Sequence, residues 1–260
     1  MSELTWSGCP LLYEAKTMNY VILAAGKGTR LHPHTKNCAK SLLRLGNGKH
    51  VLQNTIDNIR NIDEDAKIYV VVGFDQQTIK NVITGCEFID NPFYAVTNSV
   101  ASLWFARDAL DDAVTIINAD VVYPAELWNK ITNFNAPAFL CIDSSVKSGG
   151  DCNVQVLDDR IIVLSKELKE YYGEYTGVSK LDRKRAAILK TEVERMVESG
   201  FYNEWYEMAI MQCVFDNTID LHYLDFKGYE WAELDSVNDL LRARKITAPS
   251  SEETVLKAVA

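Results

Sequence analysis

Three cations and a glycine-rich turn follow the first apolar stretch of this chain. Residues 20–31 read Tyr-Val-Ile-Leu-Ala-Ala-Gly-Lys-Gly-Thr-Arg-Leu, so Lys27 and Arg30 lie inside the turn, and Lys40 comes shortly after it. Small residues let backbone N–H groups approach a ligand closely, and nearby cations neutralise phosphate oxygens. The pattern therefore predicts a triphosphate site at the end of a β-strand.

The turn differs from two well-known phosphate-binding loops. Gly26-Lys27-Gly28-Thr29 lacks the G-x-x-x-x-G-K-[ST] spacing of the P-loop. Leu31 stands where the dinucleotide-binding fingerprint has its third glycine. A strand followed by a glycine turn is common, so the turn alone specifies little.

The longer string that starts at Leu23 is more specific. With Pro33, Thr35 and Lys40, it resembles the L-A-A-G-x-G-[ST]-R-[LM] signature of nucleotidyltransferases that activate sugar phosphates and phosphocholine. The family usually has proline before this lysine, and because Ala39 replaces it we expect the loop to differ there. The resemblance implies catalytic roles for Lys27, Arg30 and Lys40, and nucleotide binding by Leu23, Ala24, Ala25, Gly26, Gly28 and Thr29.

A carboxylate follows a predicted buried strand at residues 113–117. Asn118-Ala119-Asp120 comes directly after this apolar run, where an unpartnered charge is costly. Asp120 could be an ordinary turn residue before the helix that Pro124 opens. The alternative is a metal ligand, because Mg²⁺ prefers oxygen ligands and is typically held by one or two carboxylates plus substrate phosphates.

The second candidate carboxylate lies near the end of the chain, in Glu233-Leu234-Asp235-Ser236. Either Asp235 or Ser236 could cap the helix that follows. In the family that the chain resembles, one aspartate follows the central strand and another sits in a final D-[ST] step, and together they hold Mg²⁺ against the α-phosphate. Asp120 and Asp235 occupy these positions, so the resemblance implies Mg²⁺ as the cofactor.

Residues 91–104 indicate the branch of the family. They resemble the N-x-x-Y-x-x-x-N-x-x-x-S-L-[YW] stretch of phosphocholine and aminoalkylphosphonate cytidylyltransferases, and they lack the glutamine and G-T-A step of sugar-phosphate enzymes. The resemblance implies CTP as the nucleotide, with Ser102 at the pyrimidine and Asn98 nearby. Gly73, after another predicted strand, is expected at the same rim.

Aromatic residues are concentrated in the second half of the chain. Aromatic faces attract ammonium groups by about 0.5–2 kcal/mol each, although most such residues pack in cores and rims. We expect one or two of them to enclose the head group of the acceptor, with Glu204 or Glu207 supplying negative charge. The candidates are Tyr202, Trp205, Tyr206, Tyr229 and Trp231.

The elements that would position these residues alternate between strand and helix in the first half. We therefore expect an α/β fold, a doubly wound and mostly parallel sheet with right-handed crossovers, in which ligands bind beyond the carboxyl ends of the strands. Residues 138–230 are predicted to form a smaller mixed α+β subregion on the substrate side of one domain at 18–247. Residues 1–17 are predicted to be an extension, and 248–260 a polar tail.

Hydrophobic periodicity and turn residues give the expected bounds. The helices are expected at 51–62, 76–83, 99–110, 183–197, 204–211 and 237–245, with a further helix opened by Pro124. The strands are expected at 20–23, 68–72, 86–89, 113–117, 138–142, 152–157, 161–164, 173–180, 221–224 and 229–234.

Composition narrows the class of protein. The 260 residues carry a net charge of −9, which argues against non-specific nucleic-acid binding. Six cysteines without a C-x-x-C pair indicate reduced thiols in a cytoplasmic protein. No apolar run approaches the length of a membrane span, residues 1–17 do not look like a secretory signal, and His32 and His34 have no cysteine at zinc-binding spacing.

Together these patterns predict an enzyme that transfers CMP from CTP to phosphocholine, 2-aminoethylphosphonate or a similar small phosphate. One alternative keeps the chemistry with a sugar-1-phosphate or inositol-1-phosphate as acceptor. A second is a non-catalytic nucleotide-sensing subunit on the same fold, and a redox dinucleotide enzyme is more distant. The sequence leaves the oligomeric state open, with a homodimer as one candidate.

Overall fold

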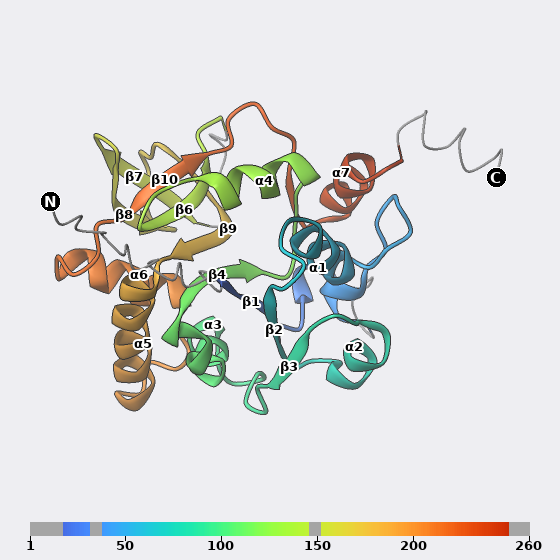
Figure 1. Cartoon of the computed structure of the whole chain (residues 1–260), viewed down its shortest axis with the longest axis horizontal. Coiled ribbons are helices and arrows are strands. Elements are labelled where there is room, and N and C mark those ends of the chain that lie inside the picture. Colours follow the sequence, from blue (N-terminus) through green and yellow to red (C-terminus); the bar gives the residue numbers. More distant parts are fainter. Residues whose placement is uncertain (1–17, 32–37, 146–151, 250–260) are drawn as a thin grey trace, which may run out of the picture.

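The computed structural model describes residues 18–31, 38–145 and 152–249 (Figure 1). The extension expected at 1–17, the residues His32–Thr35 of the signature loop, and most of the expected tail lie outside these ranges. The described helices are α1 (Val51–Ile62), α2 (Gln76–Val82), α3 (Ser99–Phe105), α4 (Ala125–Asn133), α5 (Arg183–Glu198), α6 (Tyr206–Phe215) and α7 (Val237–Ile246), with 3₁₀ turns η1 (Thr29–Leu31), η2 (Lys40–Leu42) and η3 (Arg107–Asp111).

The main sheet has the strand order β10-β6-β9-β4-β1-β2-β3, with a β7–β8 hairpin attached to β9. A separate two-stranded sheet pairs β5 with β11. The strands are β1 (Met18–Ala24), β2 (Lys67–Val72), β3 (Glu87–Asp90), β4 (Ala113–Asn118), β5 (Val121–Val122), β6 (Ala138–Asp143), β7 (Asn153–Leu157), β8 (Arg160–Ser165), β9 (Gly173–Leu181), β10 (His222–Asp225) and β11 (Ala232–Glu233).

Strand β1 lies at the point where the winding of the sheet reverses. It pairs in parallel with β2 on one side and with β4 on the other, so that Ile22 lies opposite Val70 and Ile117. The chain moves outward from β1 through β2 to β3 and then returns through α3 to β4. In such sheets the crevice beyond the carboxyl ends of the two diverging strands is where ligands bind.

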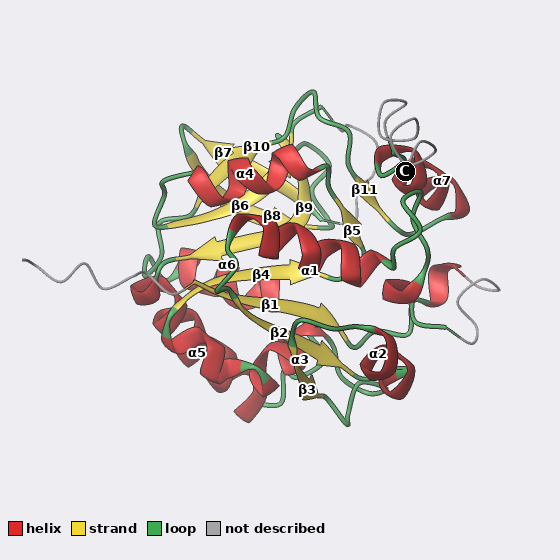
Figure 2. Cartoon of the chain, turned by 45° about the vertical axis from the view of Figure 1, so that its right-hand side comes forward, coloured by secondary structure: helices red, strands yellow, loops and turns green. Residues whose placement is uncertain are grey.

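The two faces of the sheet are covered by different helices, as Figure 2 shows. Alternate residues of β1 point to opposite faces, because side chains in a strand alternate. Val21 joins a core with apolar residues of α3, α5 and α6, whereas Tyr20 and Ile22 join a core with residues of α1, α2 and α4. The predicted doubly wound α/β fold is therefore confirmed.

The second half of the sheet is mixed, as expected. Strand β9 runs antiparallel between β4 and β6, and β10 then pairs in parallel with β6. Gly177 in β9 has φ +91°, and a Cβ there would lie 2.6 Å from Val121 Cγ1. This close approach brings β9 against the segment that follows β4.

A third, smaller core attaches α7 to the loops beyond the strands. It contains Leu31, Val51 and Val122 together with Leu234 and Leu240. The β5–β11 pairing brings Glu233 opposite Val121. The end of the chain is thereby fixed beside the residues that follow β4, although the short β5 was not predicted because two residues carry no periodic signal.

Several expected bounds were wrong by a few residues. The helix expected at 99–110 ends at Phe105 and continues as η3. Arg107 donates a hydrogen bond of 2.9 Å to the Trp104 carbonyl and lies 4.1 Å from the centre of its ring, which closes the helix end. The strand expected at 229–234 shortens to β11, because Tyr229 donates a turn hydrogen bond to Phe226.

Five of the six cysteines lie in the described ranges, and no disulfide joins any two of these five. Cys141, Cys152 and Cys213 are buried, whereas Cys38 and Cys86 are half-buried. Across these ranges, the helices are too short or too polar to span a membrane.

The Gly177 contact predicts a measurable difference between two glycines. Gly177 and Gly200 share a left-handed backbone, with φ +91° and +89°, but a Cβ at Gly200 meets nothing within 4 Å. We expect Gly200→Ala to lower the free energy of unfolding by about 1 kcal/mol through backbone strain alone. Gly177→Ala should lower it by about 2–4 kcal/mol, because the clash with Val121 adds to the strain. Urea denaturation measures both, and equal losses would contradict this packing.

Candidate active site

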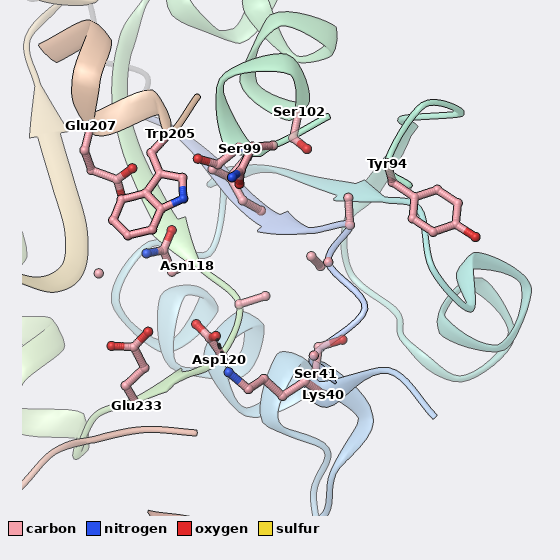
Figure 3. Close-up of a pocket in the computed structure, with 18 of the residues that line it drawn as sticks. Lys40, Ser41, Tyr94, Ser99, Ser102, Asn118, Asp120, Trp205, Glu207 and Glu233 are labelled. Carbon is pink, nitrogen blue, oxygen red and sulfur yellow. Dashed lines mark hydrogen bonds and ion pairs between the residues drawn. The ribbon is translucent and has the colours of Figure 1, made fainter. Parts of the chain in front are cut away.

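A cavity of about 350 Å³ opens at the carboxyl ends of β1 and β4 (Figure 3). Its walls come from the turn after β1, from η2, from the start of α3, from the end of β4 and from β9 and α6. The predicted residues that line it are Leu23, Ala24, Ala25, Gly26, Gly28, Arg30, Lys40, Asn98, Ser102, Asp120, Trp205 and Glu207. The winding rule for doubly wound sheets therefore located the cavity correctly.

One lysine joins the two predicted metal ligands. The Lys40 ammonium lies 2.8 Å from Asp120 Oδ2 and 2.6 Å from Asp235 Oδ1, and its side chain is 9% exposed. Figure 3 shows Lys40 and Asp120 pointing toward each other across the floor of the cavity. Burial opposes the charged form of Lys40, but both carboxylates outweigh it and raise its pKa above the usual value.

The glycine turn allows this lysine to approach. Gly28 has φ +59°, and a Cβ on Gly28 would lie 2.9 Å from Lys40 Cβ. Arg30 also reaches the same group, with Nη1 2.8 Å from Asp235 Oδ2, but its side chain is 51% exposed. The turn therefore packs against one cation and presents a second at the mouth of the cavity.

Ser236 caps α7, which leaves Asp235 available to Lys40 and Arg30. The Ser236 hydroxyl accepts a hydrogen bond from Asp239 N, and the Asp239 side chain accepts one in return from Ser236 N. The preceding residue, Leu234, donates a 3.0 Å hydrogen bond to the Asp120 carbonyl. The sequence had left the choice of cap open between Asp235 and Ser236.

The expectation of a different loop at Ala39 was wrong. Ala39 has φ −60° and ψ 141°, a conformation that proline also adopts. Its N–H donates a hydrogen bond of 3.2 Å to Asp75 Oδ2, which proline could not do. The substitution therefore keeps the backbone conformation and adds a contact to the loop after β2.

The residues expected at the nucleobase form a hydrogen-bonded group at the start of α3. Asn98 caps α3 by accepting a hydrogen bond of 2.9 Å from Ser99 N. Buried Asn91 donates one of 3.1 Å to Ser102 Oγ. Ser102 and Asn98 both line the cavity, and these contacts fix their orientation. Figure 3 shows Ser102 at the upper wall of the cavity.

Two predicted residues, Gly73 and Lys27, lie outside the lining. A Cβ on Gly73 would lie 2.5 Å from Tyr94 Cβ. The ammonium of exposed Lys27 lies 5.9 Å from the centre of the Tyr94 ring. Gly73 and Lys27 thus both lie next to Tyr94, which does line the cavity.

Of the five aromatic candidates, only Trp205 lines the cavity. Tyr206 is fully buried, and its hydroxyl is hydrogen-bonded to Tyr175 and Ser179, so Tyr206 supports the wall from behind. The Lys166 ammonium lies 3.3 Å from the centre of the Trp205 ring.

The other three aromatic side chains are engaged elsewhere. Trp231 is buried and donates a hydrogen bond of 2.8 Å to Asp143. The ring of Tyr229 lies 4.9 Å from the Lys130 ammonium, and Tyr202 is exposed. Substrate contacts by Tyr229, Trp231 or Tyr206 are therefore not supported by the geometry.

Glu207, and not Glu204, faces the cavity. Glu204 is exposed, and its backbone carbonyl accepts a hydrogen bond from Val100 N. Glu207 is buried and lines the cavity beside Trp205. Desolvation raises the pKa of Glu207 to about 7 from an ordinary 4.5, and the nearby charge of Asp120 adds to this, whereas a hydrogen bond from Asn118 and the charge of Lys166 act in the opposite direction.

Sequence reasoning missed several lining residues, although a signal was present for some of them. Asn118 and Glu233 are the last residues of β4 and β11. Because ligands in such sheets bind beyond the carboxyl ends of strands, the strand ends themselves were the signal for these two residues. Tyr175 lies inside β9, where no predicted site residue pointed to it.

The carboxylates at the floor of the cavity fit a divalent cation. Asp120, Glu233 and Asp235 each offer an oxygen, and these oxygens lie within 4.8 Å of one another. Carboxylate oxygens are the ligands that Mg²⁺ prefers. The predicted pair Asp120 and Asp235 is therefore brought together, with Glu233 as a third candidate ligand.

The sequence profile of the MobA-like NTP transferase domain matches residues 20–180, and the chain belongs to this family. The bifunctional protein GlmU of Methanococcus vannielii is 30% identical over 51% of this chain and 31% of its own length. GlmU of Methanocaldococcus jannaschii is 25% identical over 88% of this chain and 54% of its own. This chain thus spans about half or less of the length of these two curated relatives.

A shorter relative is matched over nearly its whole length. The CTP:phosphoglutamine cytidylyltransferase of Campylobacter jejuni is 24% identical over 86% of this chain and 98% of its own. The same fold occurs in the CTP:phosphocholine cytidylyltransferase of Streptococcus pneumoniae, with a TM-score of 0.72, 22% identity, and coverage of 88% of this chain and 99% of that one. It also occurs in the inositol-1-phosphate CTP transferase of T. maritima, with a TM-score of 0.69, 17% identity, and coverage of 89% and 96%.

The raised pKa of Glu207 predicts a pH-dependent stability. Because the folded pKa of about 7 exceeds the ordinary 4.5, the native state binds the extra proton, and stability falls as the pH rises between these values. Glu207→Gln removes this loss. The free energy of unfolding of Glu207→Gln, relative to that of the wild type, should therefore increase by about 3 kcal/mol from pH 4.5 to pH 8.

Glu204→Gln, at an exposed side chain, is the matched control and should follow the wild type at every pH. Chemical denaturation across the pH range measures all three proteins. A constant difference between Glu207→Gln and the wild type would contradict the buried carboxyl.

Proposed function

We propose that this chain transfers CMP from CTP to a small phosphate or phosphonate and releases pyrophosphate. The observation that carries the proposal is the buried Lys40 ammonium between Asp120 and Asp235, at the floor of a cavity that also holds the glycine turn. Membership of the NTP transferase family supports nucleotidyl transfer. The likeness to two cytidylyltransferases supports CTP as the donor.

The reaction forms one P–O bond and breaks another. A phosphoryl oxygen of the acceptor attacks the α-phosphorus of CTP, and the bond to the β-phosphate oxygen breaks to release pyrophosphate. The acceptor phosphate is already ionised near pH 7, so the step needs no general base. Catalysis then depends on positioning and on neutralising charge.

The chain's own cations would carry that neutralisation. Arg30 and the backbone of Gly26 and Gly28 would hold the departing pyrophosphate, with Lys27 near the mouth of the cavity. Lys40 would neutralise charge at the α-phosphate. Asp120 and Asp235, with Glu233, would hold Mg²⁺, which when bound supplies Lewis-acid charge stabilisation at the phosphates. Residues 18–247 would form this one transferase domain.

The far end of the cavity suits a cationic acceptor of the phosphocholine or 2-aminoethylphosphonate type. Trp205 offers an aromatic face and Glu207 a buried carboxyl beside it. The Lys166 ammonium at 3.3 Å is an example of a cation held by this ring. An acceptor with an ammonium group would gain the same attraction.

A panel assay tests the acceptor and the nucleotide together. Pyrophosphate release is measured with each NTP and Mg²⁺ against phosphocholine, 2-aminoethylphosphonate, phosphoglutamine, glucose-1-phosphate and inositol-1-phosphate. We expect turnover with CTP and an ammonium-bearing acceptor. Turnover only with a sugar or inositol phosphate would show that the acceptor is not an ammonium-bearing phosphate. Nucleotide binding without any turnover would favour a nucleotide-sensing subunit.

Lys40 is expected to act mainly in the transition state. Lys40→Ala should lower kcat by roughly 10²–10³, as measured by pyrophosphate release under saturating substrates. Lys49→Ala is the matched control, because Lys49 also pairs with an aspartate, Asp57, but its side chain is 49% exposed. Normal turnover by Lys40→Ala would show that Lys40 has another role.

Trp205 is expected to act on acceptor binding. Trp205→Leu should raise the KM of an ammonium-bearing acceptor roughly 2- to 30-fold, the range that a cation–π contact of about 0.5–2 kcal/mol gives, and should leave the KM of CTP unchanged. Tyr229→Leu removes an aromatic ring outside the cavity and serves as the control. If both variants change the acceptor KM equally, the aromatic face is not the acceptor site.

A further inference from the structure

The carboxylate oxygens that fit a divalent cation are already in contact with protein cations. Lys40 Nζ contacts Asp120 Oδ2 and Asp235 Oδ1, and Arg30 contacts the other oxygen of Asp235. A metal ion and the Lys40 ammonium would thus compete for the same two carboxylates, those of Asp120 and Asp235. Like charges at such short range repel strongly, the more so where burial lowers the local dielectric.

We propose that Lys40 is an internal counter-ion that keeps the divalent-cation site closed until a nucleotide phosphate draws its ammonium away. The carboxylates are released when Lys40 turns to the phosphate, so nucleotide binding and metal binding become coupled through one side chain. The nucleotide half of this statement rests on the proposed function. The competition between Lys40 and the metal does not depend on it.

The burial of Lys40 indicates that its ion pairs with Asp120 and Asp235 are stronger than a loose surface contact, so that a metal ion has to displace the lysine. The Lys40 side chain is 9% exposed, and the carboxylates of Asp120 and Asp235 are 24% and 25% exposed. Exposed ion pairs are weak and are easily replaced by solvent. A buried lysine that leaves without replacement would strand its partners, because an uncompensated buried charge is strongly unfavourable.

The neighbouring charges make the exchange possible. The oxygens of Asp120, Glu233 and Asp235 lie within 4.8 Å of one another, and Arg30 contacts Asp235. Three carboxylates at this distance repel one another and attract a divalent cation. Release of Lys40 therefore changes a neutralised group into a high-affinity metal site.

The cavity offers the Lys40 ammonium a second position, beside a bound phosphate. Its stem packs against Gly28, and its side chain lines the same cavity as the glycine turn expected to bind phosphate. The lysine side chain has four flexible carbons and carries a compact charge. A phosphate bound in the cavity could therefore attract the ammonium without a change in the backbone. Because coupling is reciprocal, the metal should in turn raise the affinity for nucleotide.

The test is metal binding without nucleotide. Electron paramagnetic resonance measures free Mn²⁺ during titration of the wild type, Lys40→Met, Lys40→Arg and Lys49→Met. We expect Lys40→Met to bind Mn²⁺ roughly 10- to 100-fold more tightly than the wild type, since one competing charge is gone. Lys40→Arg keeps the charge and Lys49→Met removes a charge from the distant Asp57 pair, so both should stay within about twofold of the wild type.

Asp120→Asn in the Lys40→Met background should abolish the gain, which assigns the bound metal to this site. Equal or weaker Mn²⁺ binding by Lys40→Met would overturn the proposal. Should Lys40→Met be unfolded alone, folding on addition of Mn²⁺ supports the proposal, and failure to fold with Mn²⁺ contradicts it. None of these readouts uses a substrate, so they can fail while nucleotidyl transfer holds, and they can succeed while it fails.

Discussion

The structure depends most on the contact of one lysine with two carboxylates that are far apart in the chain. Lys40 is separated from Asp120 by 80 residues and from Asp235 by 195. Three charged groups reach one point only because the fold brings together the loop after β1, the end of β4 and the connection before α7. A lysine side chain that is only 9% exposed can stay charged because both carboxylates offset the desolvation of its ammonium group.

Each supporting element has a specific part in this contact. The parallel pairing of β1 with β4 brings the glycine turn beside Asp120, and the β5–β11 pair holds Asp235 in reach. Ser236 takes the helix cap, so that Asp235 keeps both oxygens for cations. At the other end of the cavity, Glu207 is buried where desolvation favours its neutral form. The cavity thus joins a highly charged floor to a wall that is aromatic and weakly charged.

Much of this was predictable because the signals were local. The apolar face of α1 gave its bounds at Val51–Ile62, and the buried β-branched run at 68–72 gave β2. The signature string predicted the cations, and the two aspartates were predicted from a strand end and from the step before the last helix. The aromatic residues were harder, because their composition does not tell core from surface. Trp205 and Tyr206 are neighbours in sequence, yet one lines the cavity and the other is fully buried behind it.

The direction of group transfer is the central claim, and CTP labelled separately on the α- and γ-phosphorus tests it most directly. With an acceptor phosphate and Mg²⁺, we predict that the α-label appears in the acceptor product and the γ-label in pyrophosphate. A γ-label on the acceptor would indicate a kinase, and both labels in free nucleotide and inorganic phosphate would indicate a hydrolase. Either result would contradict the nucleotidyl transfer proposed for the Lys40 site.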